Sequence, residues 1–510
     1  MWLLEPTVLA FIGTVCGVVI AASVVVTSVV LARRLAPLSS SAPLTGEALV
    51  AKADIVVSGV SVGLPGSKVD VFSESNWEAL VHGECRIEPI EARGVEALLA
   101  RNVVQIKKDG EALKKVRVRE ASQTVAVSAR LGSLDLDKYG VPKALAKTMG
   151  RATQVAVAAG LEALRDAELL DEAWRLRDEY QDSTGVIYAT SFPALDAAVG
   201  EVSRFATDED YAFDRKFLFK VLVLANAQLA QLVGARGPNL QTNAACAGTT
   251  QAIGLACDLI RANRCDRVVV VSGDDASGET LMPWLGNGFN ALGAASIAPT
   301  VDLAVRPFDQ RRNGMILGAA ACGVVVGRKR GEAARPRCRV LETRFVNSAY
   351  HGAAMDKHHI AREMEFFVAS VEKRHQISRA TLAKHGMYLS HETGTHATPS
   401  SSCAANEVHA LKLVFGDHLK HLVVINTKAI TGHPMAVGVE DALAAFALSN
   451  PECRLPPLPP DTVPDPNLQA TLKLPLKDVD IHRRDLRFAL RFAAGFGSHV
   501  AFALYAAIDA

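Results

Sequence analysis

The sequence predicts an α/β chain whose largely parallel sheets are covered on both faces by helices. Short runs rich in Val and Ile recur along the chain, and amphipathic helix-like segments separate them. These runs are apolar throughout, which is typical of strands that are buried on both faces. Of the 510 residues, 49% are hydrophobic and 21% are charged, so the chain can fill a large core and wholesale disorder is excluded.

The predicted elements alternate along the chain from about residue 54 to the C-terminus. In the first part we expect strands at 54–64, 184–191 and 266–275, and helices at 154–170 and 217–235. In the second part we expect strands at 320–328, 339–349, 387–394 and 421–429, and helices near 360–374, 402–415 and 437–448. Residues 485–507 predict two final strands that are joined by a glycine turn.

The N-terminus predicts a membrane anchor. Residues 7–32 carry no charge and are long enough to cross a bilayer as one helix. Arg33 and Arg34 follow this run, whereas a secretory signal peptide carries its positive charge in front. We therefore expect residues 1–34 to be a single-pass anchor, with the rest of the chain on the cytoplasmic, stromal or matrix side. A buried core helix and an unusual targeting segment are the alternatives.

The net charge and the cysteines exclude several classes of protein. The 55 basic and 54 acidic side chains give a charge of +1, whereas a nucleic-acid binder normally has a clear basic excess. The nine cysteines are scattered and contain no CxxC pair, so we expect neither a disulfide framework nor a metal site. A glycine loop for nucleotide phosphates is also missing from the sequence, so we expect no tightly bound cofactor.

Cys246 is the candidate nucleophile. In NLQTNAACAGTTQAIGLACDLIRA it follows a strand-like run and precedes an Ala- and Gly-rich helix. A thiol at a helix N-terminus feels the positive end of the helix dipole, so we expect a lowered pKa. An arbitrary cysteine is more often a small buried hydrophobe, and Cys257 in the same helix fits that alternative.

Histidine is the usual partner of a reactive thiol, because it can transfer protons near neutral pH. Two of the fourteen histidines, His396 and His433, follow strand-like runs and lie among Gly and Thr residues. Lys428 lies at a strand end five residues before His433 and needs a counter-charge, for which Glu407 is the candidate. Taken one at a time, most histidines are surface or core residues.

Several ordered motifs resemble those of the β-ketoacyl-ACP synthases, the Cys-His-His condensing enzymes of the thiolase superfamily. The resemblance runs from DIVVSGVSVGLPG through the Cys246 motif and RPFDQRRNGMILGAAACGVVV to THATP, TKAITGH and AAGFGSHVAFAL. His396 precedes Lys428 by 32 positions and His433 by 37, in agreement with the family's spacing. His391 begins HETGT, which mimics another form of the motif, but the spacing favours His396 and makes His391 a strand residue beside the pocket.

The resemblance implies a duplicated, thiolase-like fold. It consists of two βαβαβαββ halves in a layered α-β-α-β-α arrangement, which we place at residues 51–300 and 301–510. The membrane anchor and a tether at residues 35–50, rich in Ser, Ala and Pro, would precede them. The resemblance also implies a homodimer and an active site where the two halves meet.

The resemblance further implies a decarboxylative Claisen condensation in fatty acid or polyketide synthesis. Cys246 would take an acyl group from the phosphopantetheine of an acyl carrier protein, or from coenzyme A. His396 and His433 would then stabilise the enolate that forms from a malonyl thioester, with Lys428 and Glu407 in support.

Three further positions match the family's motifs. The amides of Cys246 and Phe496 would bind the thioester oxyanion, and the Phe496 ring would act as a gate. Thr398 and Ser400 match the two hydroxyl positions that contact the pantetheine arm. A catalytically idle homologue, acting as a structural or chain-length subunit of a membrane complex, is the alternative, although idle homologues usually replace the nucleophile.

Overall fold

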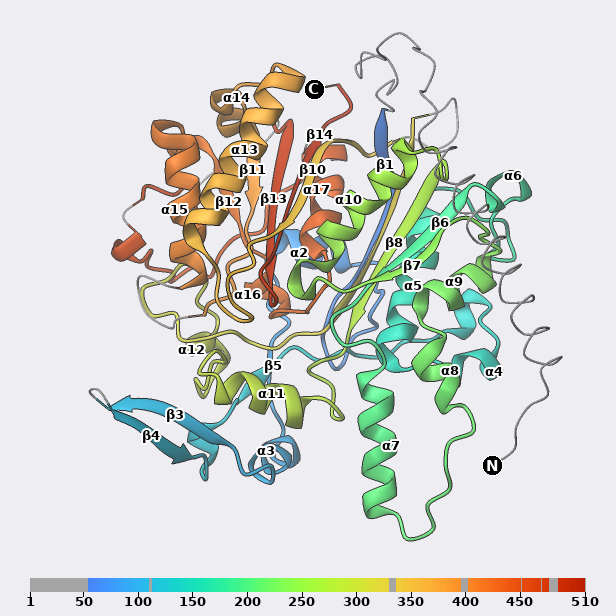
Figure 1. Cartoon of the computed structure of the whole chain (residues 1–510), viewed down its shortest axis with the longest axis vertical. Coiled ribbons are helices and arrows are strands. Elements are labelled where there is room, and N and C mark those ends of the chain that lie inside the picture. The colour runs from blue at the N-terminus through green and yellow to red at the C-terminus, as the bar shows by residue number, and fades with distance from the viewer. Residues whose placement is uncertain are drawn as a thin grey trace, which may run out of the picture. The chain divides into compact units, whose positions relative to one another are not determined.

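A ten-stranded mixed sheet is the central element of the structure (Figure 1). The computed structural model describes residues 54–509 apart from 110–111, 330–335, 396–401, 451, 469 and 477–484. Residues Ala53–Ala510 form one compact unit. Within the described residues, the spatial order of the strands is β12-β11-β13-β14-β10-β1-β9-β8-β6-β7.

The sheet consists of two halves with the same strand order. The first half contains β1 (Ile55–Gly63), β6 (Thr184–Ala189), β7 (Asn239–Thr242), β8 (Arg267–Asp274) and β9 (Ala320–Arg328). The second half contains β10 (Cys338–Asn347), β11 (Gly386–Leu389), β12 (Val423–Ile425), β13 (Phe488–Gly495) and β14 (His499–Ala506). In each half the strands lie in the order first, fifth, fourth, second, third, and the two first strands, β1 and β10, pair antiparallel.

The repeat divides the chain later than the sequence suggested. The boundary expected at residue 300 would assign β9 to the second half. In the structure, however, β9 lies between β1 and β8 and pairs antiparallel with both. The two halves therefore meet between Arg328 and Cys338, because strand pairing and not chain position defines the repeat.

Helices cover both faces of the sheet. In the first half these are α5 (Arg151–Asp166), α9 (Ala225–Val233) and α10 (Gly248–Arg261). The same half also contains α7 (Leu195–Thr207), α8 (Phe217–Leu222) and α11 (Met282–Ala291), of which α7 packs on α8 and α11 packs on α3 and β3. In the second half they are α13 (Lys357–His375), α14 (Arg379–His385), α15 (Cys403–Phe415), α16 (Lys428–Thr431) and α17 (Val439–Ser449). Helices α10 and α17 each contact strands of both halves, whereas α5 packs on the first half and α13 on the second (Figure 1).

Smaller elements decorate this core. They are α2 (Asn76–His82), α3 (Ala92–Leu99), α4 (Lys143–Ala146), α6 (Asp178–Gln181), α12 (Val301–Ala304) and two hairpin-like pairs, β2 (Glu88–Pro89) with β5 (Val127–Ser128) and β3 (Val104–Asp109) with β4 (Ala112–Arg117). The β3–β4 pair extends away from the main sheet beside α11 (Figure 1).

The physical basis of the fold is burial on both faces of the sheet. Four consecutive valines of β8, Val268–Val271, are all fully buried, because helices cover both faces of that strand. The largest apolar cluster joins β1, β8 and β9 to α10 and α17, and a second cluster lies under α13 and α15. These two clusters hold the strand ends of both halves in fixed positions, which the site requires.

Most of the predicted elements are confirmed, including the final pair β13 and β14. The expectation of a largely parallel sheet is wrong, because β9 and β14 each pair antiparallel with both of their neighbours. The helix expected at 217–235 is instead two helices, α8 and α9, separated by Val223 and Leu224. The expected membrane anchor at residues 1–34 and the tether lie outside the described residues. No helix within the described part of the chain is long and apolar enough to span a bilayer.

Candidate active site

Cys246 lies in a tight turn between β7 and α10. The turn is a short 3₁₀ segment, Ala245–Ala247, and α10 begins directly after it at Gly248. Ala245 has a φ of 46°, a left-handed conformation that costs a residue with a side chain roughly 1–3 kcal/mol. The turn places the half-buried Cys246 at the edge of a cavity instead of in the core.

The cavity has a volume of about 380 Å³ and lies where the two halves meet. The first half contributes Cys246 together with apolar side chains from α11 and from the segment that follows it. The second half contributes two histidines and the β13–β14 turn. Its lining includes Cys246, Phe289, Leu292, Met315, Tyr350, Met355, His391, Thr393, His433 and Phe496. Its volume and mostly apolar wall suit a small or medium acyl group.

His433 is the partner of the thiol. Its Nε2 atom lies 3.0 Å from the Cys246 Sγ atom, although the two residues are 187 positions apart. The backbone N–H of His433 donates to the Ile316 carbonyl at 2.7 Å, which fixes the start of the loop. The expected pairing of Cys246 with His433 is therefore present in the structure.

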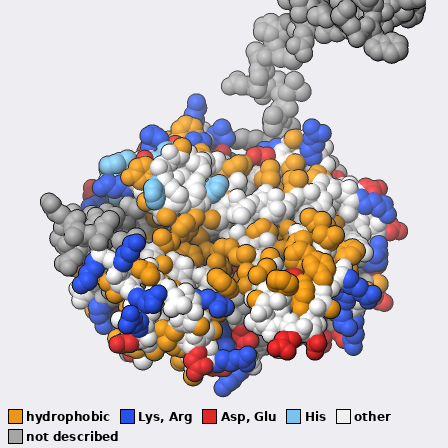
Figure 2. Space-filling model, turned by 60° about the horizontal axis from the view of Figure 1, so that its bottom comes forward, with side chains coloured by type: hydrophobic (Ala, Val, Ile, Leu, Met, Phe, Trp, Pro, Cys, Tyr) orange, Lys and Arg blue, Asp and Glu red, His pale blue; other side chains and the backbone are white. Residues whose placement is uncertain are grey.

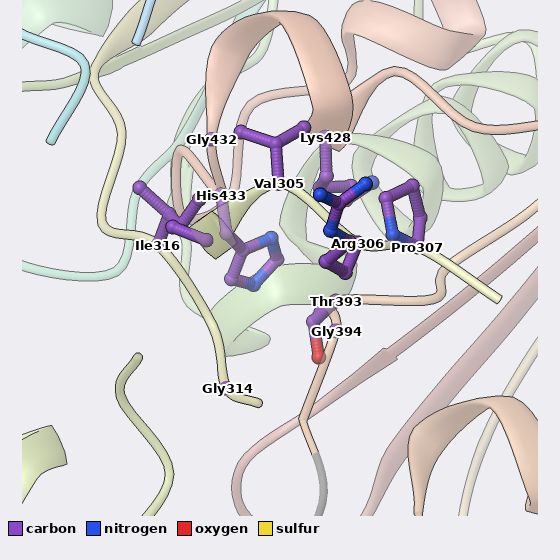
Figure 3. A pocket seen from close by; sticks show the side chains of 11 residues that line it. Val305, Arg306, Pro307, Gly314, Ile316, Thr393, Gly394, Lys428, Gly432 and His433 are labelled. Carbon is purple, nitrogen blue, oxygen red and sulfur yellow. The ribbon is translucent and has the colours of Figure 1, made fainter. Parts of the chain in front are cut away.

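A second, smaller chamber lies behind His433 (Figure 3). Figure 3 shows the His433 ring between Ile316 on one side and Arg306 on the other, with Thr393 facing it. The Nδ1 atom of His433 is buried and has no hydrogen-bond partner among the described residues. The ring is therefore held by packing and by its contact with Cys246.

His391 lies in the same cavity as His433 and brings a second imidazole to it. Its ring centroid lies 5.6 Å from that of His433, and the side chain is only 5% exposed. His391 is the second residue after β11 and lines the cavity. The expectation of a strand residue beside the pocket is therefore wrong, because the strand already ends at Leu389 and His391 itself lines the cavity. The sequence candidates His396, Thr398 and Ser400 lie outside the described residues.

The counter-charge of Lys428 is Glu440, and not Glu407 as expected. The Lys428 ammonium donates to the Glu440 Oε1 atom, and the Thr427 hydroxyl donates to the same oxygen at 2.6 Å. Glu440 lies in the first turn of α17. Its pKa is held well below the usual range by Arg491 and Lys428 despite burial. Sequence reasoning missed Glu440 because nothing in the motif spacing distinguished it from Glu407.

Glu407 has a different position in the site. It lies on α15, where its Oε1 atom accepts a hydrogen bond from the backbone N–H of His391 at 3.1 Å. Burial raises the pKa of Glu407, and the His391 N–H and the charge of Arg491 oppose that shift. Glu407 therefore holds the backbone of His391 and does not contact Lys428 through any hydrogen bond or ion pair in the described residues.

The backbone at Gly495 approaches the nucleophile closely. A Cβ atom at this position would lie 2.5 Å from the Ala244 carbonyl oxygen and 2.9 Å from the Cys246 nitrogen, so only glycine fits. Phe496 follows it, lines the cavity, and makes an edge-to-face contact with Phe289 at 5.7 Å. This approach brings the β13–β14 turn beside the Cys246 amide, as the expected pair of oxyanion donors requires.

The thiol and both imidazoles are uncharged in the resting site. Burial raises the pKa of Cys246 to about 12, although Lys428 acts in the opposite direction. Burial and the Lys428 charge lower the pKa of His433 to about 3, and burial also places the pKa of His391 well below its usual value. The lowered thiol pKa expected from the helix N-terminus is wrong, because burial raises this pKa by more than Lys428, Arg491 and the backbone N–H lower it. Neutral His433 can then act as the base for the thiol proton.

This charge state predicts an unusual pH dependence of Cys246 alkylation. Because the thiol pKa is about 12, the thiolate fraction rises roughly tenfold per pH unit throughout the accessible alkaline range. We expect the rate of reaction with iodoacetamide to rise from pH 7 to pH 10 without a plateau, as followed by mass spectrometry of the Cys246 peptide. A plateau below pH 8 would show an activated thiolate instead.

Within the described residues, no group of three or more His, Cys, Asp or Glu side chains could hold a metal ion. Cys246 instead pairs with His433, and Lys428 pairs with Glu440. The site therefore offers a thiol, a base, a second imidazole and backbone donors, which together suit acyl transfer.

Comparisons with known proteins agree with this geometry. The family model described as "Beta-ketoacyl synthase, N-terminal domain" matches residues 52–331, which covers β1 to β9. The 3-oxoacyl-[acyl-carrier-protein] synthase 2 of Staphylococcus aureus strain N315 is 28% identical over 416 residues, covering 78% of this chain and 91% of that protein.

Solved structures show the same fold. A β-ketoacyl synthase from Burkholderia phymatum superposes with a TM-score of 0.71 at 16% identity, covering 89% of this chain and all of the other. A type II polyketide ketosynthase, solved in complex with its acyl carrier protein, has a TM-score of 0.68 at 19% identity and the same coverage. The family model spans more than half of the chain, and its end coincides with the boundary between the two halves. The chain belongs to the β-ketoacyl synthase family.

Proposed function

We propose that the protein catalyses a decarboxylative Claisen condensation between an acyl group on Cys246 and a malonyl thioester, in fatty acid or polyketide synthesis. The observation that carries this proposal is the 3.0 Å contact between Cys246 Sγ and His433 Nε2, with the His391 ring 5.6 Å from that of His433. A lone thiol–imidazole pair would suit many acyl transfers. A second neutral imidazole allows two hydrogen bonds to be donated to one enolate oxygen, which a condensation requires.

In the first half-reaction the Cys246 sulfur attacks the carbonyl carbon of an acyl thioester. The thiol proton passes to His433 Nε2, and the carrier thiolate leaves with a proton. The thioester carbonyl oxygen gains negative charge as the sulfur attacks. The backbone N–H groups of Cys246 and Phe496 donate hydrogen bonds to this oxyanion and stabilise it. The acyl chain then occupies the cavity beside Phe289 and Met315.

In the second half-reaction a malonyl thioester enters and loses carbon dioxide. The electron pair of the broken C–C bond forms an enolate, whose oxygen accepts hydrogen bonds from His391 and His433. The enolate carbon then attacks the Cys246 thioester, which releases a 3-oxoacyl thioester and the Cys246 thiolate. The thiolate takes up a proton from solvent water, and the thiol is restored. Neutral imidazoles are suitable donors because they remain in place without a proton transfer at this step.

The acyl donor is a thioester on the phosphopantetheine arm of an acyl carrier protein. Two observations support this choice over coenzyme A. The related Staphylococcus enzyme is named for acyl-carrier-protein substrates, and the related polyketide ketosynthase was solved with its carrier protein. Thr398 and Ser400, as candidates for contacts with the arm, keep that role as part of the proposal.

The proposal is tested by incubating the full-length protein with an acyl thioester and measuring its intact mass. We expect a mass increase equal to one acyl group, and release of carbon dioxide and a 3-oxoacyl product after malonyl thioester is added. No acylation of the wild-type protein would favour the idle-subunit alternative instead.

Paired histidine variants test which imidazole stabilises the enolate. We expect His391→Gln to lower the condensation rate by about 10²–10³-fold, the usual effect of losing one such donor, while Cys246 is still acylated. His396→Gln should keep its rate within a few-fold of wild type, because His391 already fills the position opposite His433. A larger loss of condensation rate in His396→Gln than in His391→Gln would support His396, the assignment made from motif spacing.

Residues 1–34 form a single-pass membrane anchor in this proposal, and the catalytic part lies on the cytoplasmic, stromal or matrix side. The support is the uncharged run at residues 7–32 and the two arginines that follow it. Carbonate extraction of membranes should leave the full chain in the pellet and release a chain that lacks residues 1–50. Release of both would contradict the anchor.

A homodimer completes the proposal. Strand β7 is the last strand of the sheet, and exposed apolar side chains lie nearby on α7 and α8, namely Val202, Phe205, Leu218, Phe219 and Leu222. Figure 2 shows hydrophobic side chains in a band across one face, with charged side chains mainly at its periphery. An unpaired strand edge with apolar neighbours suits pairing with a second copy. Light scattering should give twice the mass of the chain, and a monomer mass would contradict this.

A further inference from the structure

Arg491 is a buried charge that no step of the proposed reaction uses. It lies in the middle of β13 and is only 2% exposed, and burying an arginine is costly unless every part of the guanidinium finds a partner. Its partners lie at the end of β11 and on α17. Such a residue either stabilises the fold alone or also holds other groups in place.

On one side, Arg491 binds the backbone just before His391. Its Nη1 atom donates to the carbonyl oxygens of Leu389 at 3.2 Å and Ser390 at 3.0 Å. These are the last residue of β11 and the first residue beyond it, where the backbone leaves the sheet. The guanidinium therefore determines the direction in which the chain continues to His391.

On the other side, Arg491 binds the carboxylate that holds Lys428. Its Nη2 atom lies 3.2 Å from the Glu440 Oε2 atom, while Lys428 occupies Oε1 of the same carboxylate. Lys428 starts α16, which ends just before the turn that carries His433. A further carboxylate, Asp441, lies 3.8 Å from Arg491 Nε.

We propose that Arg491 is a positioning residue that joins the His391 backbone to the Glu440–Lys428 pair, and so sets the relative placement of the two histidines. The inference rests on the proposed function of these histidines. Arginine suits this role because its planar fork offers five donors in a rigid arrangement, whereas lysine offers one point charge. A shift of about 1 Å in such a constellation can lower a rate about 10²-fold.

Arg491 also affects the charge state of the site. Burial is the largest cause of the lowered pKa of His391 and His433, and the positive charges of Lys428 and Arg491 add to it. The Glu440 carboxylate opposes these charges at both histidines, while Glu407 lies at the His391 backbone. Removing the Arg491 charge should therefore raise the pKa of both imidazoles, so that they become protonated at higher pH.

The experiment compares full-length wild type with Arg491→Gln and Arg491→Lys. For Arg491→Gln we expect a kcat for condensation about 10²-fold lower, with the KM for the acyl thioester changed by less than about threefold, because the acyl cavity does not contain Arg491. The acidic limb of its pH–rate profile should move to higher pH. Arg491→Lys should keep that limb near its wild-type position, because the charge remains, but should regain only part of kcat.

Asp441→Asn is the matched control. Asp441 contacts Arg491 from the same carboxylate cluster, but its hydrogen bonds come from Thr250 and Tyr505, which do not reach either histidine. We expect this variant to lose stability while its pH profile stays that of wild type. The difference between the two positions separates placement of the histidines from general loss of stability.

Titration of the His391 and His433 ring signals by NMR gives a readout that does not depend on turnover. Higher pKa values of the His391 and His433 rings in Arg491→Gln than in wild type support the inference. If Arg491→Gln does not fold, a lowered kcat of Arg491→Lys supports it instead. An unchanged kcat in Arg491→Lys, or unchanged pH profiles and ring titrations in Arg491→Gln, would overturn the positioning role. Failure of wild-type acylation would instead overturn the proposed function, and the ring titrations would still report on Arg491.

Discussion

Replacing Cys246 with alanine should abolish acylation of the protein and lower the condensation rate by at least about 10³-fold. The sulfur is the atom that forms the acyl bond, and its partner His433 at 3.0 Å cannot accept an acyl group in the same geometry. The loss should be chemical and not structural, because Cys246 is half-buried and its removal leaves the neighbouring core intact. Intact-mass measurement after incubation with an acyl thioester checks this.

Cys257→Ala is the control for this variant. Cys257 lies on the same helix, α10, and is fully buried in the apolar core, as the sequence suggested. We expect Cys257→Ala to be acylated at the wild-type rate and to lose some stability because of the small cavity. A Cys246→Ala protein that still carries an acyl group on another cysteine, such as the exposed Cys85, would remove Cys246 from its role.

Replacing Glu440 with glutamine should destabilise the protein by about 3–5 kcal/mol. The change leaves Lys428 and Arg491 buried at 8% and 2% exposure without the carboxylate that they share. This loss is a large part of the 5–15 kcal/mol that holds a typical domain folded. Urea denaturation followed by circular dichroism measures it as a lower midpoint.

The difference in stability between wild type and Glu440→Gln should depend on pH, because the pKa of Glu440 is lowered in the folded protein. Because the pKa is lower in the folded protein than its usual value of 4.5, the stabilisation is full above pH 4.5 and is lost as the pH falls below it. The difference in the free energy of unfolding between wild type and Glu440→Gln should therefore become smaller as the pH is lowered below 4.5. Glu91→Gln, at an exposed pair with Arg130, should cost less than about 1 kcal/mol. Equal midpoints for the Glu440 and Glu91 variants would contradict the importance of the buried pair.

The local features of the site could be predicted from the sequence. The strand-turn-helix around Cys246 follows from a short extended run, small residues at the turn and a helix-forming segment behind it. The loop that carries His433 follows from a strand end and the TKAITGH residues. These arrangements depend on neighbours in the chain, so a sequence motif contains most of the information about them.

The partners of each charge could not be predicted in this way. Glu407 and Glu440 are both acidic residues on helices after a site histidine, and only the packing of α17 brings Glu440 to Lys428. Arg491 was missed for the same reason. Its position opposite Leu389 depends on the parallel register of β13 with β11, more than 100 residues apart in the chain.

The pKa of the Cys246 thiol likewise depends both on residues next to it in the chain and on elements that only the fold brings near it. A helix N-terminus after the cysteine is visible in the sequence and favours a thiolate, whereas the burial that raises the pKa to about 12 comes from surrounding elements. Desolvation depends on everything that packs around a group, so it cannot be evaluated from the residues next to it in the chain.

The amino-acid sequence alone predicted the α/β fold, the order of most of its elements and the approach of Cys246 to His433. The entry of His391 into the cavity, the pairing of Lys428 with Glu440 and the position of Arg491 required the assembled sheet. Periodicity and turn residues act over a few neighbours, whereas hydrogen bonds and ion pairs of a buried site join strands whose register is set by the packing of the whole domain.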